Sequence, residues 1–176
     1  MPAFRRDERD FNPVIIIERC FMHHRAMVEW ERRGAVFTDN RYSRTHIWKF
    51  DGGAEVMGSS APQIVPAPFS DPRGVDPEEA FICSLASCHM LWFLAIAAKK
   101  GFVVDSYTDA AEAESGKNDE GKIAILQVTL KPVVFFAGEK KPSEEDFRHM
   151  HHEAHEKCFI AASVKTQIKH DPRLVI

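Results

Sequence analysis

Four cysteines are the residues of this 176-residue chain whose type and spacing point most directly to chemistry. They are Cys20, Cys83, Cys88 and Cys158, separated by 63, 5 and 70 positions. No pair has the close spacing of a structural zinc site, and a reducing compartment does not favour a fixed disulfide framework. The thiols are therefore either inert buried side chains, the commoner outcome for a single cysteine, or redox-active groups.

The overall composition limits the classes of protein to consider. A length of 176 residues fits one domain, and 44% hydrophobic with 28% charged residues excludes an integral membrane protein. The net charge of −3 provides no concentrated basic surface for nucleic acid. The apolar run at residues 14–17 is too short for a secretory signal. We therefore expect a cytoplasmic protein with neither nucleic-acid nor membrane partners.

The strongest helix signal covers residues 76–101 and contains Cys83 and Cys88. Asp76 is a candidate N-cap, Glu79 completes a capping box, and Gly101 supplies the stop. Residues 80–98 are apolar around the whole helix, with two serines and a histidine that argue against a membrane span. Such a helix must be buried on every side, and a chain this small can hardly surround it. We therefore expect a homodimer.

An alternating strand pattern precedes this helix, at residues 42–50. One face of this strand carries Tyr42, Arg44, His46, Trp48 and Phe50. Arg41 falls on the opposite face. The long loop between this region and the helix contains four prolines, and long ordered loops often form the wall of a pocket.

The rest of the chain predicts a hairpin, a second helix and a closing strand. The hairpin strands cover residues 103–114 and 122–136, the helix runs from Ser143 to about Lys157, and the last strand covers 163–170. The apolar stripe of the second helix places Cys158 on its buried face. The fold class is α+β with mainly antiparallel sheets. We divide the chain into an N-terminal extension, residues 1–25, and one domain, residues 26–176.

Two segments, residues 76–89 and 154–158, resemble the two cysteine motifs of the OsmC/Ohr family. The first reads Asp-Pro-Glu-Glu-Ala at its start and Leu-Ala-Ser-Cys-His at its end, and the second reads Ala-His-Glu-Lys-Cys. The resemblance covers about residues 26–170. It implies an intertwined homodimer in which sheets wrap two long central helices. Phe159 follows the second cysteine where better-characterised branches have proline, which is typical of a divergent OsmC-like branch.

The resemblance also implies the reduction of organic hydroperoxides by a reactive Cys88, a resolving Cys158, Glu78 and an arginine. The Cys88 thiolate would attack the peroxide to form a sulfenic acid, which Cys158 converts to a disulfide that an external dithiol reduces. Arg44 is the candidate arginine, because its strand face carries large side chains, and Arg73 in the loop before the helix is the rival. We expect neither a cofactor nor a metal.

The spacing of Glu78 and Cys88 constrains this site. Ten residues on one helix separate the two side chains by ~15 Å along its axis. Glu78 therefore cannot serve the cysteine of its own helix, but it could serve that of an antiparallel partner helix. The site should span two protomers.

Less specific interpretations compete with this one. His149, His151, His152 and His155 crowd the second helix, and the pair His151 and His155 could hold a transition metal. No third ligand is evident, so we expect these histidines to face solvent. Cys83 is expected to pack as a small apolar side chain. The alternative function is a non-catalytic dimeric domain that binds an apolar ligand or a metal ion.

Overall fold

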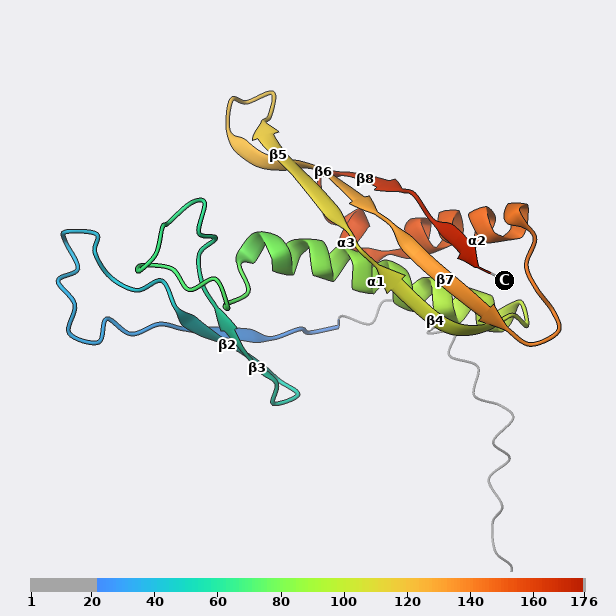
Figure 1. Ribbon diagram of the computed structural model, residues 1–176, viewed down its shortest axis with the longest axis horizontal. Coiled ribbons are helices and arrows are strands. Elements are labelled where there is room, and N and C mark those ends of the chain that lie inside the picture. The colour runs from blue at the N-terminus through green and yellow to red at the C-terminus, as the bar shows by residue number, and fades with distance from the viewer. Residues whose placement is uncertain (1–21, 176) are drawn as a thin grey trace, which may run out of the picture.

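Three three-stranded sheets and a long helix form the α+β fold (Figure 1). The computed structural model describes residues 22–175, so Cys20 and most of the predicted extension lie outside the described residues. Four strand pairs are antiparallel, whereas β6–β8 and β7–β9 are parallel. The predicted class, α+β with mainly antiparallel sheets, is confirmed.

The N-terminal sheet has the order β1–β2–β3. Its strands are β1 (Ala26–Glu29), β2 (His46–Phe50) and β3 (Glu55–Gly58). The strand predicted at 42–50 is therefore confirmed only in its second half. Residues before His46 leave the sheet, because the Arg44 amide donates to the carbonyl of Phe69 in the long loop (2.8 Å) instead of to a neighbouring strand.

The other two sheets have the orders β4–β7–β9 and β5–β6–β8. Their strands are β4 (Val103–Asp109), β5 (Glu112–Lys117), β6 (Ile123–Leu130), β7 (Pro132–Ala137), β8 (Gln167–His170) and β9 (Arg173–Val175). Each long strand predicted for the hairpin is thus divided between two sheets. At the division, the Lys131 amide donates to Asp109 Oδ1 (2.7 Å), and Pro132 has no N–H for a sheet.

Helix α1 (Pro77–Lys99) is the central helix predicted from the sequence. Asp76 and Glu79 form the expected capping box, and Gly101 adopts φ +75°, where a side chain would be strained. By length and composition α1 could cross a membrane, but it packs against α2 (Glu144–Lys157), α3 (Phe159–Ala162), β4 and β6, as a core helix does.

One chain does not bury α1 all round. Only 28% of its apolar window is buried, and exposed residues recur every fourth position on one face. They are Cys83, Ser87, Leu91 and Ala95. Cys83 is therefore exposed in the single chain, where we expected it to pack as an apolar side chain. This uncovered face, which we call the α1 stripe, is what the expected homodimer would have to cover.

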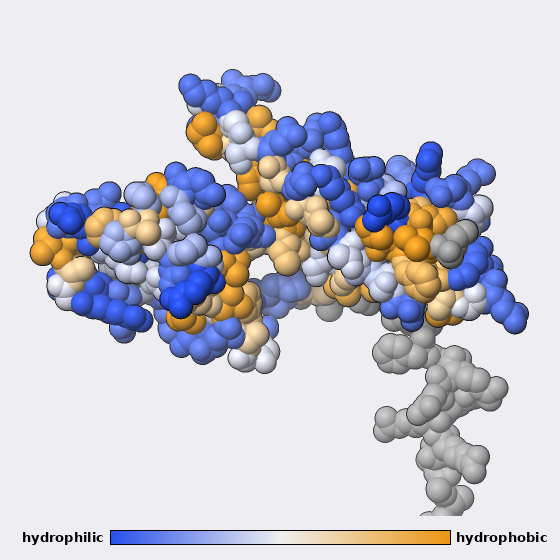
Figure 2. All heavy atoms as spheres, viewed as in Figure 1, coloured by the Kyte–Doolittle hydropathy of each residue, from blue (hydrophilic) through white to orange (hydrophobic). Residues whose placement is uncertain are grey.

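The described residues divide into two parts joined by α1. The N-terminal sheet lies beyond the first turn of α1, whereas the other two sheets, α2 and α3 gather around its later turns (Figure 1). A bridge between Gly58 and Val75 connects the first sheet to the helix start. Figure 2 shows apolar side chains on both sides of the narrow region between the two parts.

Candidate functional site

The two predicted redox cysteines lie together in the second part of the molecule. Cys88 is half-buried in the middle of α1, and Cys158 is buried at the C-terminal end of α2. Packing of α1 against α2 brings their thiols within hydrogen-bonding reach. Both are free thiols. The apolar stripe on α2 that predicted the burial of Cys158 is confirmed, because Phe147, Met150 and Ala154 are buried with it.

The environment of Cys158 favours its neutral form. Burial, followed by the hydrogen bond with Cys88, raises the pKa of Cys158 to about 11. The Ala161 amide donates to the Cys158 Sγ at 3.4 Å and opposes this effect, but burial dominates. Few Cys158 thiols are ionised at neutral pH, so this residue is poorly suited to attack a peroxide first.

The predicted Arg44 and Glu78 line a different site, a cavity of about 570 Å³ between the N-terminal sheet and the start of α1. Most of its wall is apolar, and an aromatic cluster contributes strongly to it: Phe37 stacks on Tyr42 at 4.6 Å, and Trp30 meets Tyr42 edge-on at 5.3 Å. Trp30 and Phe37 could not be predicted as part of this site, because they lie in irregular segments that have no periodic pattern.

Within this cavity the guanidinium of Arg44 folds back onto its own loop. It lies 3.9 Å above the Tyr42 ring and donates to the Asn40 carbonyl (3.0 Å) and side-chain oxygen (2.6 Å). Arg44 also donates to the Tyr42 carbonyl. Arg44 and Glu78 form no ion pair with each other within residues 22–175, although both line the same cavity.

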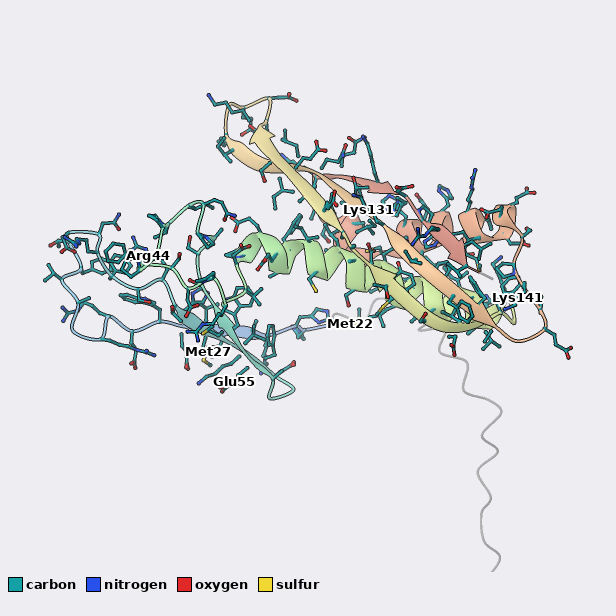
Figure 3. All side chains as sticks on the ribbon, in the orientation of Figure 1. Met22, Met27, Arg44, Glu55, Lys131 and Lys141 are labelled. Carbon is teal, nitrogen blue, oxygen red and sulfur yellow. The ribbon has the colours of Figure 1, made fainter. Side chains whose placement is uncertain are left out.

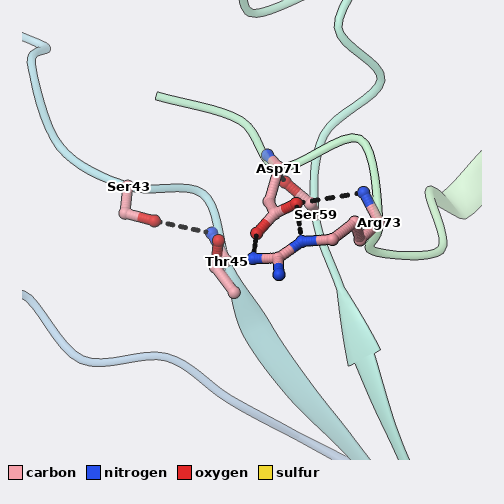
Figure 4. Close-up of polar contacts among 5 residues, drawn as sticks. All are labelled: Ser43, Thr45, Ser59, Asp71 and Arg73. Carbon is pink, nitrogen blue, oxygen red and sulfur yellow. Dashed lines mark hydrogen bonds and ion pairs between the residues drawn. The ribbon is translucent and has the colours of Figure 1, made fainter. Parts of the chain in front are cut away.

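Arg73, the rival arginine, is engaged elsewhere. Its Nε and Nη2 donate to the two carboxylate oxygens of Asp71 at 3.0 and 2.7 Å (Figure 4). These hydrogen bonds lower the pKa of Asp71 to about 2. Asp71 is held in turn by its own amide, which donates to Ser59 Oγ (2.9 Å). The Arg73 side chain is 81% exposed and does not line the cavity, so the structure favours Arg44.

The cavity and the thiol pair are separate within one chain. Figure 3 shows Arg44 beyond the N-terminal end of α1, away from the later turns of this helix. Glu78 lies in the first turn of α1, whereas Cys88 lies ten residues later in the same helix. Within one chain Arg44 and Glu78 therefore lie apart from Cys88, and the site that spans two protomers stays a prediction.

A cluster of buried and half-buried histidines adjoins the thiol pair, which corrects the expectation of solvent exposure for His151 and His155 of α2. His151 is buried, and its Nδ1 shares a 2.9 Å hydrogen bond with Nε2 of buried His89 on α1. The His170 ring on β8 lies 4.7 Å from both His89 and His155. His149 and His152 are exposed, as expected. The missed signal is that position 151 belongs to the apolar stripe of α2.

Burial favours the neutral form of His89, His151 and His170. It lowers the pKa of His89 and of His151 to about 3, and that of His170 to about 4, while neighbouring histidines add smaller effects in the same direction. Among residues 22–175, no three histidine, cysteine or acidic side chains are arranged to hold a metal ion. The cluster, called the histidine cluster below, comprises His89, His151, His155 and His170.

Comparison with protein families matches residues 70–173 to the family described as OsmC-like protein. An OsmC-like protein of unknown function from Vibrio cholerae is 49% identical, with a TM-score of 0.85 over 86% of this chain and 99% of that one. A comparison with curated proteins gives no match.

More distant structures share the fold. An organic hydroperoxide resistance protein from Elizabethkingia anophelis is 13% identical, with a TM-score of 0.63 over 89% of this chain and 97% of that one. The organic hydroperoxide resistance protein OhrB of Bacillus subtilis is 15% identical, with a TM-score of 0.57 over 88% and 98%. At these identities the likeness concerns the fold alone.

Proposed function

The chain belongs to the OsmC-like protein family, and we propose that it is a two-cysteine thiol peroxidase that reduces organic hydroperoxides. The observation that carries this proposal is the pair of free thiols, Cys88 and Cys158, adjacent in space although far apart in sequence. The occurrence of organic hydroperoxide resistance proteins among structures of the same fold supports a peroxidase-related role. The chain has a soluble fold, and we place its activity in the cytoplasm, in the response to oxidative stress.

The two thiols divide the reaction between them. The Cys88 thiolate attacks the terminal peroxide oxygen, the O–O bond breaks, and Cys88 becomes a sulfenic acid while the leaving alkoxide takes a proton from water and departs as the alcohol. Cys158 then attacks the Cys88 sulfur, forming a disulfide and releasing water. An external dithiol reduces the disulfide in two exchange steps, so no bound cofactor is required. The raised pKa of Cys158 suits this order, because a neutral thiol does not compete for the peroxide.

A homodimer completes the site in this proposal. The α1 stripe, which includes Leu91 (61% exposed), and other exposed apolar side chains, such as Ile123 (74% exposed), leave apolar surface for a second copy to cover. Antiparallel packing of two α1 helices would bring Glu78 and Arg44 of one chain toward Cys88 of the other. A freed Arg44 guanidinium could then pair with Glu78 and stabilise the thiolate.

The aromatic cavity supplies the place for an organic substrate. Its wall is mostly apolar, with the charged groups of Arg44 and Glu78 on one side. An apolar organic group would rest against Trp30 and Phe37 while the polar peroxide faces these charges. The same cavity favours the second candidate function, a non-catalytic domain that binds an apolar ligand.

Single-turnover assays separate the two functions. Cys88→Ser should abolish the reduction of cumene hydroperoxide, whereas Cys158→Ser should turn over once and leave Cys88 as a sulfenic acid that mass spectrometry detects. Cys83→Ser is the matched control on the same helix and should keep full activity. If Cys88→Ser reduces the peroxide as fast as the unchanged protein, the assignment of the reaction to Cys88 is wrong. If the unchanged protein reduces no hydroperoxide, the binding function is favoured.

A further inference from the structure

We propose that His46 recognises the O–H group of the substrate in the aromatic cavity, so that the cavity selects hydroperoxides and alcohols over dialkyl peroxides and ethers. This role rests on the proposed function and narrows the substrate class of the same cavity. His46 lines the cavity together with Arg44 and Glu78, and the reaction sequence proposed for the thiols does not use it. The hydrogen bonding and the position of its ring support the role.

One ring nitrogen of His46 already has a partner. Its Nδ1 lies 2.7 Å from the backbone carbonyl oxygen of Arg44. A carbonyl oxygen can only accept a hydrogen bond, so Nδ1 carries the hydrogen and donates it. A neutral imidazole has one N–H, and Nε2 therefore keeps its lone pair. Nε2 has no hydrogen-bond partner within residues 22–175, and the residue is only half-buried, so a ligand can reach this acceptor.

Gly58 allows the imidazole to lean across the sheet toward the start of α1. Gly58 is the partner of His46 in the pairing of β2 with β3. A methyl group at position 58 would lie 2.4 Å from Nε2, so the ring occupies the space above the glycine. On its other side Gly58 forms a bridge with Val75, just before Pro77 and Glu78 of the cavity wall. The free nitrogen is therefore directed from β2 over β3, and not toward β1.

An organic hydroperoxide matches these groups. Its terminal O–H can donate to the lone pair of Nε2, while its organic group packs against Trp30 and Phe37. An ether or a dialkyl peroxide has no hydrogen to donate and would leave Nε2 without a partner, which weakens its binding. The hydrogen bond also holds the terminal oxygen, the atom that the thiolate attacks, beside the polar groups of the wall. His46 is thus a binding and positioning residue, and it transfers no proton.

Two ligands that cannot oxidise a thiol test this role by binding alone. Cumyl alcohol has the carbon skeleton of cumene hydroperoxide and one O–H, whereas cumyl methyl ether has no hydrogen to donate. Equilibrium dialysis of the full chain with each compound gives the ratio of the ether Kd to the alcohol Kd. In His46→Asn this ratio should fall about fivefold, because one hydrogen bond is lost. The asparagine amide keeps a donor near the Nδ1 position for the Arg44 carbonyl, so the backbone there stays fixed.

Further variants separate recognition from a structural role. Gly58→Ala keeps His46 but adds the methyl group that displaces its ring, so it should lower the ratio as His46→Asn does. His46→Gln places an amide oxygen near the position of Nε2 and should keep the ratio. His149→Asn, at an exposed position of α2, is the matched control and should also keep it. In nitrogen-15-labelled protein, the Nε2 resonance of His46 should shift with the alcohol and not with the ether.

The same ratio in the unchanged protein, His46→Asn and Gly58→Ala would overturn the role of His46, and so would a lack of binding of both compounds. No thiol reacts in the dialysis, so this result is independent of the peroxidase proposal. If the ratio falls in His46→Asn but the unchanged protein reduces no hydroperoxide, the cavity recognises an O–H group and the peroxidase proposal is wrong. If the ratio does not change while hydroperoxide is reduced, His46 is not the acceptor and the thiol mechanism stands.

Discussion

The two parts of the molecule hold complementary halves of one chemistry. The cavity beside the N-terminal sheet holds Arg44 and Glu78, whereas the region around α2 holds two thiols and the histidine cluster. The cavity has charged groups and open space but no thiol. The region around α2 has thiols in a closed, uncharged interior. The difference teaches that one chain holds Cys158 as a neutral thiol, whereas the charge that supports a Cys88 thiolate in the proposed mechanism would come from a second chain.

The largest expected effect is that acid destabilises the part of the molecule that contains α2 and the histidine cluster. His89, His151 and His170 have folded pKa values of about 3, 3 and 4, below the ordinary value of 6.5. The unfolded chain therefore binds more protons than the folded chain below about pH 6.5, and the free energy of unfolding falls as the pH decreases. The decrease should approach about 4 kcal/mol per pH unit for the three groups together, until the pH nears the folded values.

Urea denaturation at pH 7, 6 and 5 measures this decrease. His170→Gln should remove about one third of the slope, because it removes one of three equivalent protonations. His149→Gln, at an exposed position on α2, should not change it. A free energy of unfolding that stays constant between pH 7 and 5 would contradict the burial of neutral imidazoles.

The second prediction concerns the α1 stripe, where the two parts would meet across a dimer. Leu91→Lys places a charge on a position that is 61% exposed in one chain and that the proposed partner covers. Burying an unpaired ammonium is costly, so sedimentation should show a monomer. Hydroperoxide reduction should fall by at least about 100-fold, the loss of roughly 3 kcal/mol in transition-state stabilisation.

His149→Lys is the control for Leu91→Lys, because it adds the same charge at an exposed position of α2, outside the α1 stripe. The His149→Lys variant should stay dimeric and active. A fully active monomeric Leu91→Lys variant would show that each chain builds its own complete site.

Local signals in the sequence predicted the elements that position the thiols. Asp76 and Glu79 fixed the start of α1, and the stripe that begins at Phe147 fixed the buried face of α2. Long-range pairing was not predictable in this way. The histidine cluster depends on β8 lying parallel to β6, with His170 opposite Leu130, and no local pattern specifies that register. The division of the hairpin strands near Pro132 likewise depends on which sheet each half joins.

The cavity shows the same contrast. The alternation at residues 42–50 placed Arg44 on the same face as Tyr42 and His46, and all three line the cavity although only His46 is in a strand. Trp30 and Phe37 come from segments without periodicity, and only tertiary structure shows that they stack around Tyr42.

The smallest expected effect concerns Arg44, whose charge would act across the proposed dimer on the part that holds the thiols. If this guanidinium supports the thiolate of the partner's chain, Arg44→Ala should raise the pKa of Cys88 and slow its alkylation by iodoacetamide at neutral pH. A rise of one unit in the Cys88 pKa corresponds to about 1.4 kcal/mol and roughly a tenfold slower reaction, with the rate profile moved to higher pH. The measurement uses a background in which Cys88 is the one reactive cysteine.

Two arginines of the same region serve as controls for Arg44→Ala. Arg73→Ala removes a guanidinium that is held by Asp71 and is 81% exposed, and Arg41→Ala removes one that lies 5.9 Å over the Phe69 ring outside the cavity. Neither should move the alkylation profile, because solvent screens exposed charges at these positions. If Arg73→Ala shifts the profile and Arg44→Ala does not, the loop before α1 supplies the cation. In that case the aromatic cavity would bind substrate only, and the loop before α1 would stabilise the thiolate.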